Sequence, residues 1–212
     1  MPFSQEFLPS PGIRAGIWHI TESADHLLSL VHLSDAETNR YQSFRNDLRK
    51  RQWLAYRILL RQMLDPDSPA ISYDTHGKPF LVTGSHFISV SHAGNYAAAI
   101  YAEKSPVGVD IEKLQVRVER VKERFMHPTE LASISTENRL EHLYVYWCGK
   151  EALYKLHGKP EVDFRNDIFI HPFDYLCNTK RICTATVNID GGRRDYVLNF
   201  EKLGNYMLVT AS

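Results

Sequence analysis

The spacing of hydrophobic residues along the chain changes several times between the period of two that is typical of strands and the period of 3.6 that is typical of helices. Helical patterns run from 23 to 64, with breaks near Ser34 and Asn46, and again from 142 to 158. Strand patterns are predicted at 14–20, 86–103 (two strands joined by a turn at 93–95), 105–112, 164–170, 182–190, 194–201 and 205–211. This interleaving predicts an α+β fold.

Local signals mark several of the boundaries between these elements. Ser34 followed by Glu37 has the spacing of a capping box at a helix N-terminus. The amphipathic run at 51–64 is followed by Pro66 and Pro69, which cannot continue a helix. The segment Thr-His-Gly-Lys-Pro-Phe at 75–80 contains the residues of a turn.

The order of elements in the first half is repeated in the second. The tripeptide Gly-Asn-Tyr opens an apolar strand at 94–96 and again at 204–206, and an aromatic-rich helix with Trp53 or Trp147 precedes each. A tripeptide match alone can be coincidence, but the matching order favours two similar halves. We therefore expect a pseudo-twofold pair of α+β halves, with a ligand site in the cleft between them. The expected halves are residues 1–105 and 106–212.

Composition narrows the class of protein. Of 212 residues, 43% are hydrophobic, and 25 basic residues balance 25 acidic ones, so no overall field attracts nucleic acid or an anionic membrane. Neither a signal peptide nor an apolar run long enough to cross a bilayer is found. The three cysteines form no CxxC pair, which is typical of reduced thiols. We expect a soluble cytoplasmic protein without nucleic-acid or membrane partners.

The first chemical motif is Val-Gly-Val-Asp-Ile-Glu at 107–112. In a strand, Asp110 and Glu112 point to one side, while Val109 and Ile111 pack on the other. Two neighbouring carboxylates repel each other unless a cation lies between them, and oxygen ligands of this kind suit Mg²⁺. Taken alone, the pattern is more often an edge strand with solvated acids.

The second motif is Trp-Cys-Gly-Lys-Glu-Ala-Leu-Tyr-Lys at 147–155. Glu151 and Lys155 are four residues apart on a helix, so they share one face, and Trp147 lies one turn earlier. This face offers an acid, a base and an apolar wall. The alternative is a surface ion pair with Trp147 in an ordinary core.

Together and in this order, the motifs resemble those of the surfactin-synthetase-activating (Sfp-like) class of 4′-phosphopantetheinyl transferases. The class has (V/I)-G-(V/I)-D-x-E and (F/W)-x-x-K-E-(A/S)-x-x-K, both matched here without a gap. The resemblance extends from about Ser34 to about Leu156. It implies two similar α+β halves with the site between them, Mg²⁺ as cofactor, coenzyme A as co-substrate and apo acyl or peptidyl carrier proteins as acceptors.

The resemblance also implies roles for individual residues. Asp110, Glu112 and Glu151 are expected to hold Mg²⁺ with the pyrophosphate of coenzyme A. Lys150 and Lys155 match the lysines of the family, and both are expected to bind coenzyme A. Lys155 is expected to contact phosphate oxygens. The residues implied to bind the adenine nucleotide and its 3′-phosphate are Lys78, Pro79, Ser91, His92, Arg51 and, less directly, Arg40.

Each nucleotide residue also has a plainer explanation. His92 at a strand end can be a core or turn histidine, and Lys78 a solvated turn lysine. A solvated basic face accounts for most of the basic residues near the first long helix, which are Arg45, Arg49, Lys50, Arg51, Arg57 and Arg61.

The implied reaction is attack by a serine hydroxyl on the β-phosphorus of coenzyme A, with 3′,5′-ADP as the leaving group. Glu151 is the expected proton acceptor, directly or through a water, and with Lys155 it forms the expected catalytic pair. Glu130 matches an acid of some family members, but a glutamate in the first turn of a helix also has a capping explanation. Two other classes stay open: a non-catalytic binding protein, and a phosphotransferase for another nucleotide, although neither glycine-rich phosphate motif occurs.

The segment from about Gln115 to Ser135 is a hypothetical docking surface for carrier proteins, which are expected to be acidic around their serine. An ordinary amphipathic helix explains it equally well. We expect the chain to work as a monomer. The residues proposed for steering and apolar contact are Arg117, Arg120, Lys122, Arg124, Phe125 and Met126.

Overall fold

The structure is a computed structural model, and it describes residues 3–64, 71–82, 86–158, 161–175 and 181–212. The chain divides into two compact units, Met1–Ser105 and Pro106–Ser212. Each unit combines helices with an antiparallel sheet, so the predicted α+β fold is confirmed. Among the described residues, no helix has both the length and the apolar character that crossing a membrane requires.

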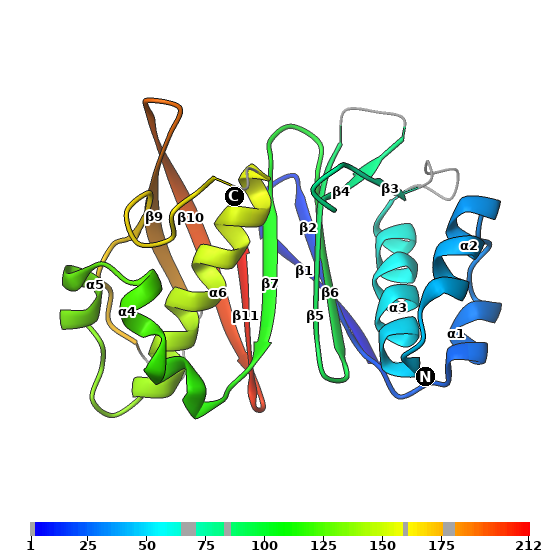
Figure 1. The fold of residues 1–212 in the computed structure, drawn as a ribbon, viewed down its shortest axis with the longest axis horizontal. Coiled ribbons are helices and arrows are strands. Elements are labelled where there is room, and N and C mark those ends of the chain that lie inside the picture. Colours follow the sequence, from blue (N-terminus) through cyan, green and yellow to red (C-terminus); the bar gives the residue numbers. More distant parts are fainter. Residues whose placement is uncertain (1–2, 65–70, 83–85, 159–160, 176–180) are drawn as a thin grey trace. The chain divides into compact units, whose positions relative to one another are not determined.

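In the first unit, a long helix packs on a four-stranded antiparallel sheet (Figure 1). The sheet has the order β1-β2-β6-β5, and α3 packs against β2 and β6 around a core that includes Trp18, Trp53 and Leu60. A separate pair, β3 and β4, completes the unit. Its elements are β1 (Phe3–Ser10), β2 (Ile13–His19), α1 (Ala24–Ser29), α2 (Asp35–Ser43), α3 (Asp47–Met63), β3 (Ile71–Tyr73), β4 (Pro79–Leu81), β5 (Phe87–Ala93) and β6 (Tyr96–Ala102).

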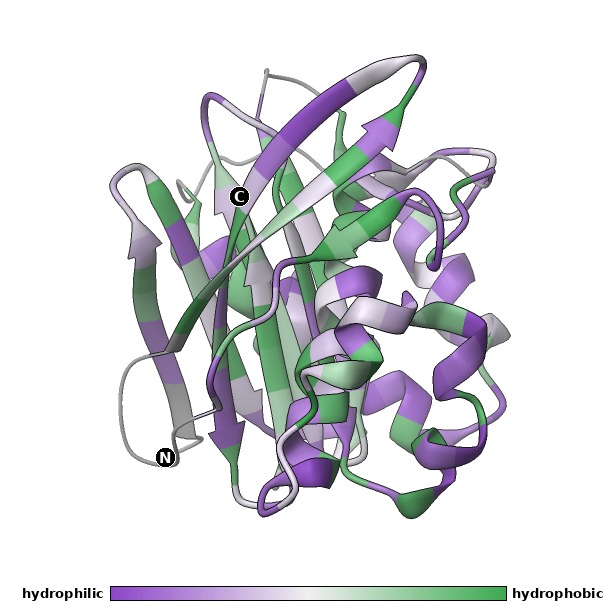
Figure 2. Cartoon of the chain, turned by 90° about the vertical axis from the view of Figure 1, so that its left-hand side faces the viewer, coloured by the Kyte–Doolittle hydropathy of each residue, from purple (hydrophilic) through white to green (hydrophobic). Residues whose placement is uncertain are grey.

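The second unit has a five-stranded antiparallel sheet in the order β7-β11-β10-β9-β8, with α6 packed against β7 and β11. Figure 2 shows hydrophobic positions along the strands and frequent hydrophilic positions on the short helices and turns. The elements of the second unit are β7 (Gly108–Lys113), the 3₁₀-helix η1 (Val116–Arg120), α4 (Lys122–Phe125), α5 (Pro128–Ala132), α6 (Arg139–His157), β8 (Ile168–Ile170), β9 (Arg181–Ile189), β10 (Gly192–Leu203) and β11 (Tyr206–Ala211).

The two units share one arrangement of strands. The order β2-β6-β5 in the first corresponds to β7-β11-β10 in the second, and the Gly-Asn-Tyr tripeptide forms the hairpin turn in both. The backbone N–H of Ile20, just after β2, donates to the Asn95 carbonyl at 2.7 Å. In the same way, the N–H of Leu114, just after β7, donates to the Asn205 carbonyl at 2.9 Å. The repeated tripeptide thus occupies the same place in both units.

Most of the predicted helices and strands are present, and several boundaries differ. The capping box is confirmed, because Ser34 and Glu37 bond each other reciprocally at the start of α2. The predicted strand at 164–170 is shorter, because only Ile168–Ile170 pairs with β9. Strand β1 was not predicted, and the turn expected at 75–80 is flanked by β3 and β4. Pro66 and Pro69 lie outside the described residues.

A buried histidine in the second unit gives a testable pH dependence. His142 is packed among Tyr146, Phe173 and Tyr175, and its Nδ1 accepts from the backbone N–H of Ser135 at 3.1 Å. Burial lowers the pKa of His142 to about 4. As the pH falls, His142 is therefore protonated in the unfolded chain before it is protonated in the folded protein. The folded state is stabilised by the neutral histidine above pH 6.5, and this contribution is lost as the pH falls toward 4.

Between pH 6.5 and 4.5, the wild type should lose more free energy of unfolding than His142→Phe, and the difference should be on the order of 1 to 3 kcal/mol. Urea unfolding of both proteins at several pH values measures this difference. Equal acid sensitivity in the two proteins would show that His142 does not carry the effect.

Candidate active site

The first part of the candidate site lies on β7, where alternate side chains separate into two sets. Val109 and Ile111 are buried, and Asp110 and Glu112 take the alternate positions, as the strand period predicted. Gly108 begins the strand where it approaches α6 closely, because a Cβ there would lie 1.9 Å from the Ala152 carbonyl oxygen. The contact between strand and helix therefore requires glycine at this position.

Helix α6 brings an acid and a base to the same place. The Nζ of Lys155 lies 2.7 Å from Asp110 Oδ1 and donates to the Val109 carbonyl at 3.3 Å. Glu151, one turn earlier on the helix, is close enough to Asp110 and Glu112 for both to disfavour its charged form. The strand and the helix thus form a carboxylate cluster of Asp110, Glu112 and Glu151 beside Lys155.

The electrostatics of the carboxylate cluster are those of crowded like charges. Burial, and then the charge of Asp110, raise the pKa of Glu151 to about 7, and Lys155 opposes this. Burial and Asp110 likewise raise the pKa of Glu112 above its ordinary value. With three acids and one lysine, the ionised cluster has a formal charge of about −2. A positive ligand would relieve this repulsion.

A divalent cation fits the chemistry of the carboxylate cluster. All three acids offer oxygen ligands, and Mg²⁺ takes one or two protein carboxylates and completes its shell with water and phosphate oxygens. In the described part of the chain, no group of three or more histidine, cysteine, aspartate or glutamate side chains has the geometry of a metal site. The role of the three acids as metal ligands therefore stays a prediction.

Lys150 does not belong to this cluster, contrary to the expected contact with coenzyme A. Its side chain is 0% exposed, and its Nζ lies 2.8 Å from Glu130 Oε2. The same ammonium donates to the carbonyls of Phe164 and Ile168, each at 2.7 Å. These three acceptors use all three N–H bonds of the lysine. We therefore withdraw Lys150 from the residues that hold coenzyme A.

Glu130 is unsuitable as a proton acceptor for the same reason. Its side chain is also 0% exposed, and its carboxylate accepts from the backbone N–H groups of His127 and Ile170, each at 2.7 Å. The capping explanation is confirmed, because Glu130 closes the capping box that begins at His127. The Glu130–Lys150 ion pair joins α5, α6 and β8 inside the second unit.

The proposed docking segment has basic residues at its surface, but not the apolar contacts that we expected. Phe125 and Met126 are buried, and Phe125 packs against Trp147 at 5.0 Å between ring centroids. Val116 is instead 73% exposed. Lys122 is paired with Glu119 at 3.1 Å. The residues left exposed on this segment with a positive charge are Arg117, Arg120 and Arg124.

In the first unit, helices α2 and α3 and the β3–β4 hairpin line a cavity of about 560 Å³. We call it the arginine pocket, after Arg40, Arg49 and Arg57 in its lining. Trp53 and Tyr73 also line it, and the wall continues to Gly77 in the turn before Lys78. Positive charge beside aromatic rings suits a ligand with both phosphate and a planar base.

The other expected nucleotide residues are placed on β5 and on the β3–β4 turn. Ser91 is buried on β5, and His92 follows it with Nε2 in contact with the Arg49 guanidinium. Lys78 is partly buried, which lowers the pKa of its ammonium, and Pro79 begins β4. These positions are compatible with phosphate binding, and their roles stay predictions.

Arg49 is a second candidate on α3, and the role of Arg51 stays a prediction. The Nε of Arg51 lies 2.8 Å from Asp47 Oδ2 one turn earlier, and Arg51 is not part of the lining of the arginine pocket. The sequence did contain a signal for the pocket residues. Arg49, Trp53 and Arg57 are spaced by four, so they follow one face of the helix.

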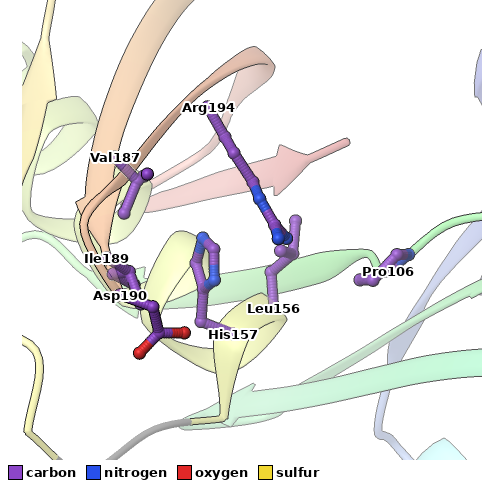
Figure 3. A pocket seen from close by; sticks show the side chains of 8 residues that line it. Pro106, Leu156, His157, Val187, Ile189, Asp190 and Arg194 are labelled. Atoms are coloured by element: carbon purple, nitrogen blue, oxygen red, sulfur yellow. The ribbon is translucent and has the colours of Figure 1, made fainter.

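A smaller cavity of about 220 Å³ lies in the second unit at the end of α6 (Figure 3). Arg194 extends from β10 toward Leu156, and His157 lies between them and Asp190. The lining is otherwise mainly apolar and includes none of the three acids of the carboxylate cluster. We therefore do not include this cavity in the candidate site.

Comparison with known proteins agrees with the motifs and the geometry. Residues 106–200 match the sequence model of the 4′-phosphopantetheinyl transferase superfamily. This match covers most of the second unit, which contains the whole carboxylate cluster and Lys155, and the predicted resemblance is confirmed.

Individual relatives show the same likeness at low identity. A 4′-phosphopantetheinyl transferase of Bacillus subtilis is 30% identical over 101 residues, which are 45% of this chain and 44% of that protein. The 4′-phosphopantetheinyl transferase Sfp of Bacillus subtilis strain 168 is 29% identical over 108 residues, 48% of this chain and 47% of Sfp. The transferase ffp of Bacillus subtilis is 27% identical over 149 residues, 65% of each chain. The chain spans about half the length of the first curated relatives it matches.

Proposed function

We propose that this protein transfers the 4′-phosphopantetheine group of coenzyme A to a serine of apo acyl or peptidyl carrier proteins. The observation that supports this most directly is the carboxylate cluster with Lys155, formed by two motifs in the unit that matches the transferase superfamily. In the proposed reaction, the serine oxygen forms a bond to the β-phosphorus of coenzyme A, and the bond between that phosphorus and the bridging oxygen breaks. The serine proton is lost, and 3′,5′-ADP leaves with the electron pair.

Lys155 and Glu151 have the chemistry that this reaction needs. Lys155 is held at its position by Asp110, yet 29% of its side chain is exposed, so its ammonium can also meet a phosphate oxygen. Glu151 has two carboxylate oxygens, so one can bind a cation and the other can accept the serine proton. Burial and the charge of Asp110 raise the pKa of Glu151 to about 7 in the cluster without a cation, and a bound Mg²⁺ would lower this pKa again.

We assign Asp110, Glu112 and Glu151 as the ligands of Mg²⁺. When bound, the ion would supply positive charge to the pyrophosphate as negative charge develops on the leaving group. The nucleotide end of coenzyme A is assigned to the first unit, with the arginine pocket, Lys78, Pro79, Ser91 and His92 as the binding residues. The free thiols of Cys148 and Cys183 agree with a cytoplasmic setting, which is part of this proposal.

The direct test is mass spectrometry of apo carrier proteins after incubation with the protein, coenzyme A and Mg²⁺. We expect a gain equal to one phosphopantetheine on the carrier serine, and no gain when a chelator replaces Mg²⁺. A panel that includes fatty acid, polyketide and nonribosomal peptide carriers would define the range of acceptors. No gain on any carrier would favour a binding protein that keeps the fold without the activity.

Arg117, Arg120 and Arg124 are proposed to steer acidic carriers toward the site. Burial and Asp110 raise the pKa of Glu112, and Arg117 is near enough to oppose this rise, so Arg117 is close to the carboxylate cluster. We expect Arg120→Glu to raise the carrier KM by about tenfold at low salt without changing coenzyme A affinity, and salt should reduce the effect.

Steady-state kinetics at two ionic strengths and calorimetry with coenzyme A measure these quantities. Lys104→Glu, at an exposed position of the first unit, is the matched charge reversal. The docking surface would be misassigned if both variants changed the carrier KM equally, or if neither did.

A further inference from the structure

A buried polar network forms part of the wall of the arginine pocket. The Arg57 side chain is 1% exposed, and its Nε lies 3.3 Å from Glu37 Oε1 on α2. Its guanidinium carbon also lies 3.4 Å from the centroid of the Trp53 ring. A buried guanidinium needs both a charge partner and filled hydrogen bonds, so Arg57 is held in one orientation.

Two tyrosine hydroxyls complete this network. Arg57 Nη1 donates to the hydroxyls of Tyr56 and Tyr73, each at 2.9 Å, and the two hydroxyls lie 2.6 Å apart. Tyr56 is on α3 beside Arg57, whereas Tyr73 is the last residue of β3. Two of these bonds therefore link the long helix to the β3–β4 hairpin, the one from Arg57 to Tyr73 and the one between the two tyrosine hydroxyls.

The β3–β4 hairpin is held in part by packing on the core. Among the described residues, Ile71–Tyr73 pairs with Pro79–Leu81, and Ile71 and Leu81 are buried in the core of the first unit. A two-stranded pair of this size is marginal by itself, so the bonds to Tyr73 add to this packing at the end of β3. The turn beyond Tyr73 is internally fixed, because Asp74 Oδ1 accepts from the backbone N–H groups of His76 and Lys78, each at 2.9 Å. Tyr73 is thus followed directly by a turn that is held by its own hydrogen bonds.

Tyr73 also meets a pocket arginine directly. The guanidinium carbon of Arg40 lies 6.0 Å from the centroid of the Tyr73 ring, within the range of a cation–π contact. Arg40 and Tyr73 both line the arginine pocket. One tyrosine thus touches the buried Arg57 through its hydroxyl and the pocket-lining Arg40 through its ring.

We propose that Tyr73, held by Arg57, is a positioning residue for the nucleotide end of coenzyme A. It fixes the turn at 74–78 and supports Arg40 at the arginine pocket, so its loss weakens binding of the nucleotide and leaves the chemical step unchanged. This inference rests on the proposed function, and it adds a residue that neither family motif contains.

The test compares Tyr73→Phe with Tyr56→Phe. Both changes remove one hydroxyl from the same network and break the bond between the two tyrosines, but Tyr56→Phe keeps the bond between Arg57 and Tyr73, and Tyr56 does not line the pocket. Calorimetry with 3′,5′-ADP gives the affinity of the nucleotide, steady-state kinetics give KM and kcat, and thermal melting gives stability.

We expect Tyr73→Phe to weaken 3′,5′-ADP binding by about three- to tenfold, the usual scale for one hydrogen bond, and to raise the coenzyme A KM by a similar factor with kcat unchanged. Tyr56→Phe should keep both affinities near wild type with a similar loss of melting temperature. Equal weakening in both variants, or wild-type affinity in Tyr73→Phe, would overturn the inference. If wild-type protein bound neither coenzyme A nor 3′,5′-ADP, the proposed function would fail, and this inference with it.

Discussion

Glu151→Gln is expected to lower kcat for phosphopantetheine transfer on the order of a hundredfold or more, the usual scale for losing a proton acceptor or a positioned charge. The amide keeps the size of the side chain and one oxygen, but it loses the charge and the ability to accept the serine proton. The fold should persist, because the change removes one of three acids that repel each other. Single-turnover transfer and a melting curve measure both effects.

Two companion variants sharpen this prediction. Glu141→Gln changes a glutamate on the same helix that is paired with Lys202 at 2.8 Å, and it should retain normal turnover. Asp110→Ala removes the partner of Lys155 while Val109 and Ile111 still pack the strand, so transfer should collapse without unfolding. Near-normal turnover in Glu151→Gln or Asp110→Ala, with a native melting temperature, would contradict the assignment of the carboxylate cluster.

Lys150→Met is expected to lower the free energy of unfolding by about 3 to 5 kcal/mol, because it leaves the buried Glu130 without its cation. Two backbone carbonyls, of Phe164 and Ile168, also lose their donor. The double variant Glu130→Gln/Lys150→Met removes the stranded charge and should regain part of the loss. Urea unfolding of the wild type, both single variants and the double variant gives the coupling energy.

This cycle separates a structural lysine from one that binds substrate. If Lys150 contacted a phosphate of coenzyme A, Lys150→Met would weaken coenzyme A binding and leave the unfolding free energy unchanged. The coupling energy between positions 130 and 150 would then be near zero. In the Lys150→Met variant, transfer activity should fall only if the loss of the ion pair shifts α6 and moves Glu151 away from β7.

Local sequence signals were sufficient for much of the fold, and together with the family resemblance they indicated the carboxylate cluster. Strand alternation placed Asp110 and Glu112 on one side of β7, and four-residue spacing placed Glu151 and Lys155 on one face of α6. The capping box at Ser34 fixed the start of α2. Each of these signals depends on residues within a few positions of one another, where geometry follows from the type of element.

The corrections concern the direction of side chains and their distant partners. Lys150 and Glu151 are neighbours in the motif, but successive helix residues point about 100° apart, so one faces the interior and the other faces Asp110. The partner of Lys150 is twenty positions away at Glu130, which no periodicity indicates. The sequence also did not single out Arg49, because its contact with His92 joins two residues that are 43 positions apart.

The most direct measurement of the central claim is the intact mass of one apo carrier protein after incubation with coenzyme A and Mg²⁺. Three mixtures are compared, containing wild-type protein, Glu151→Gln and Glu141→Gln. The account predicts a gain of one phosphopantetheine with wild type and with Glu141→Gln, and a strongly delayed gain with Glu151→Gln. Modification at the same rate in all three mixtures would contradict it, because the carboxylate cluster would then have no part in the transfer.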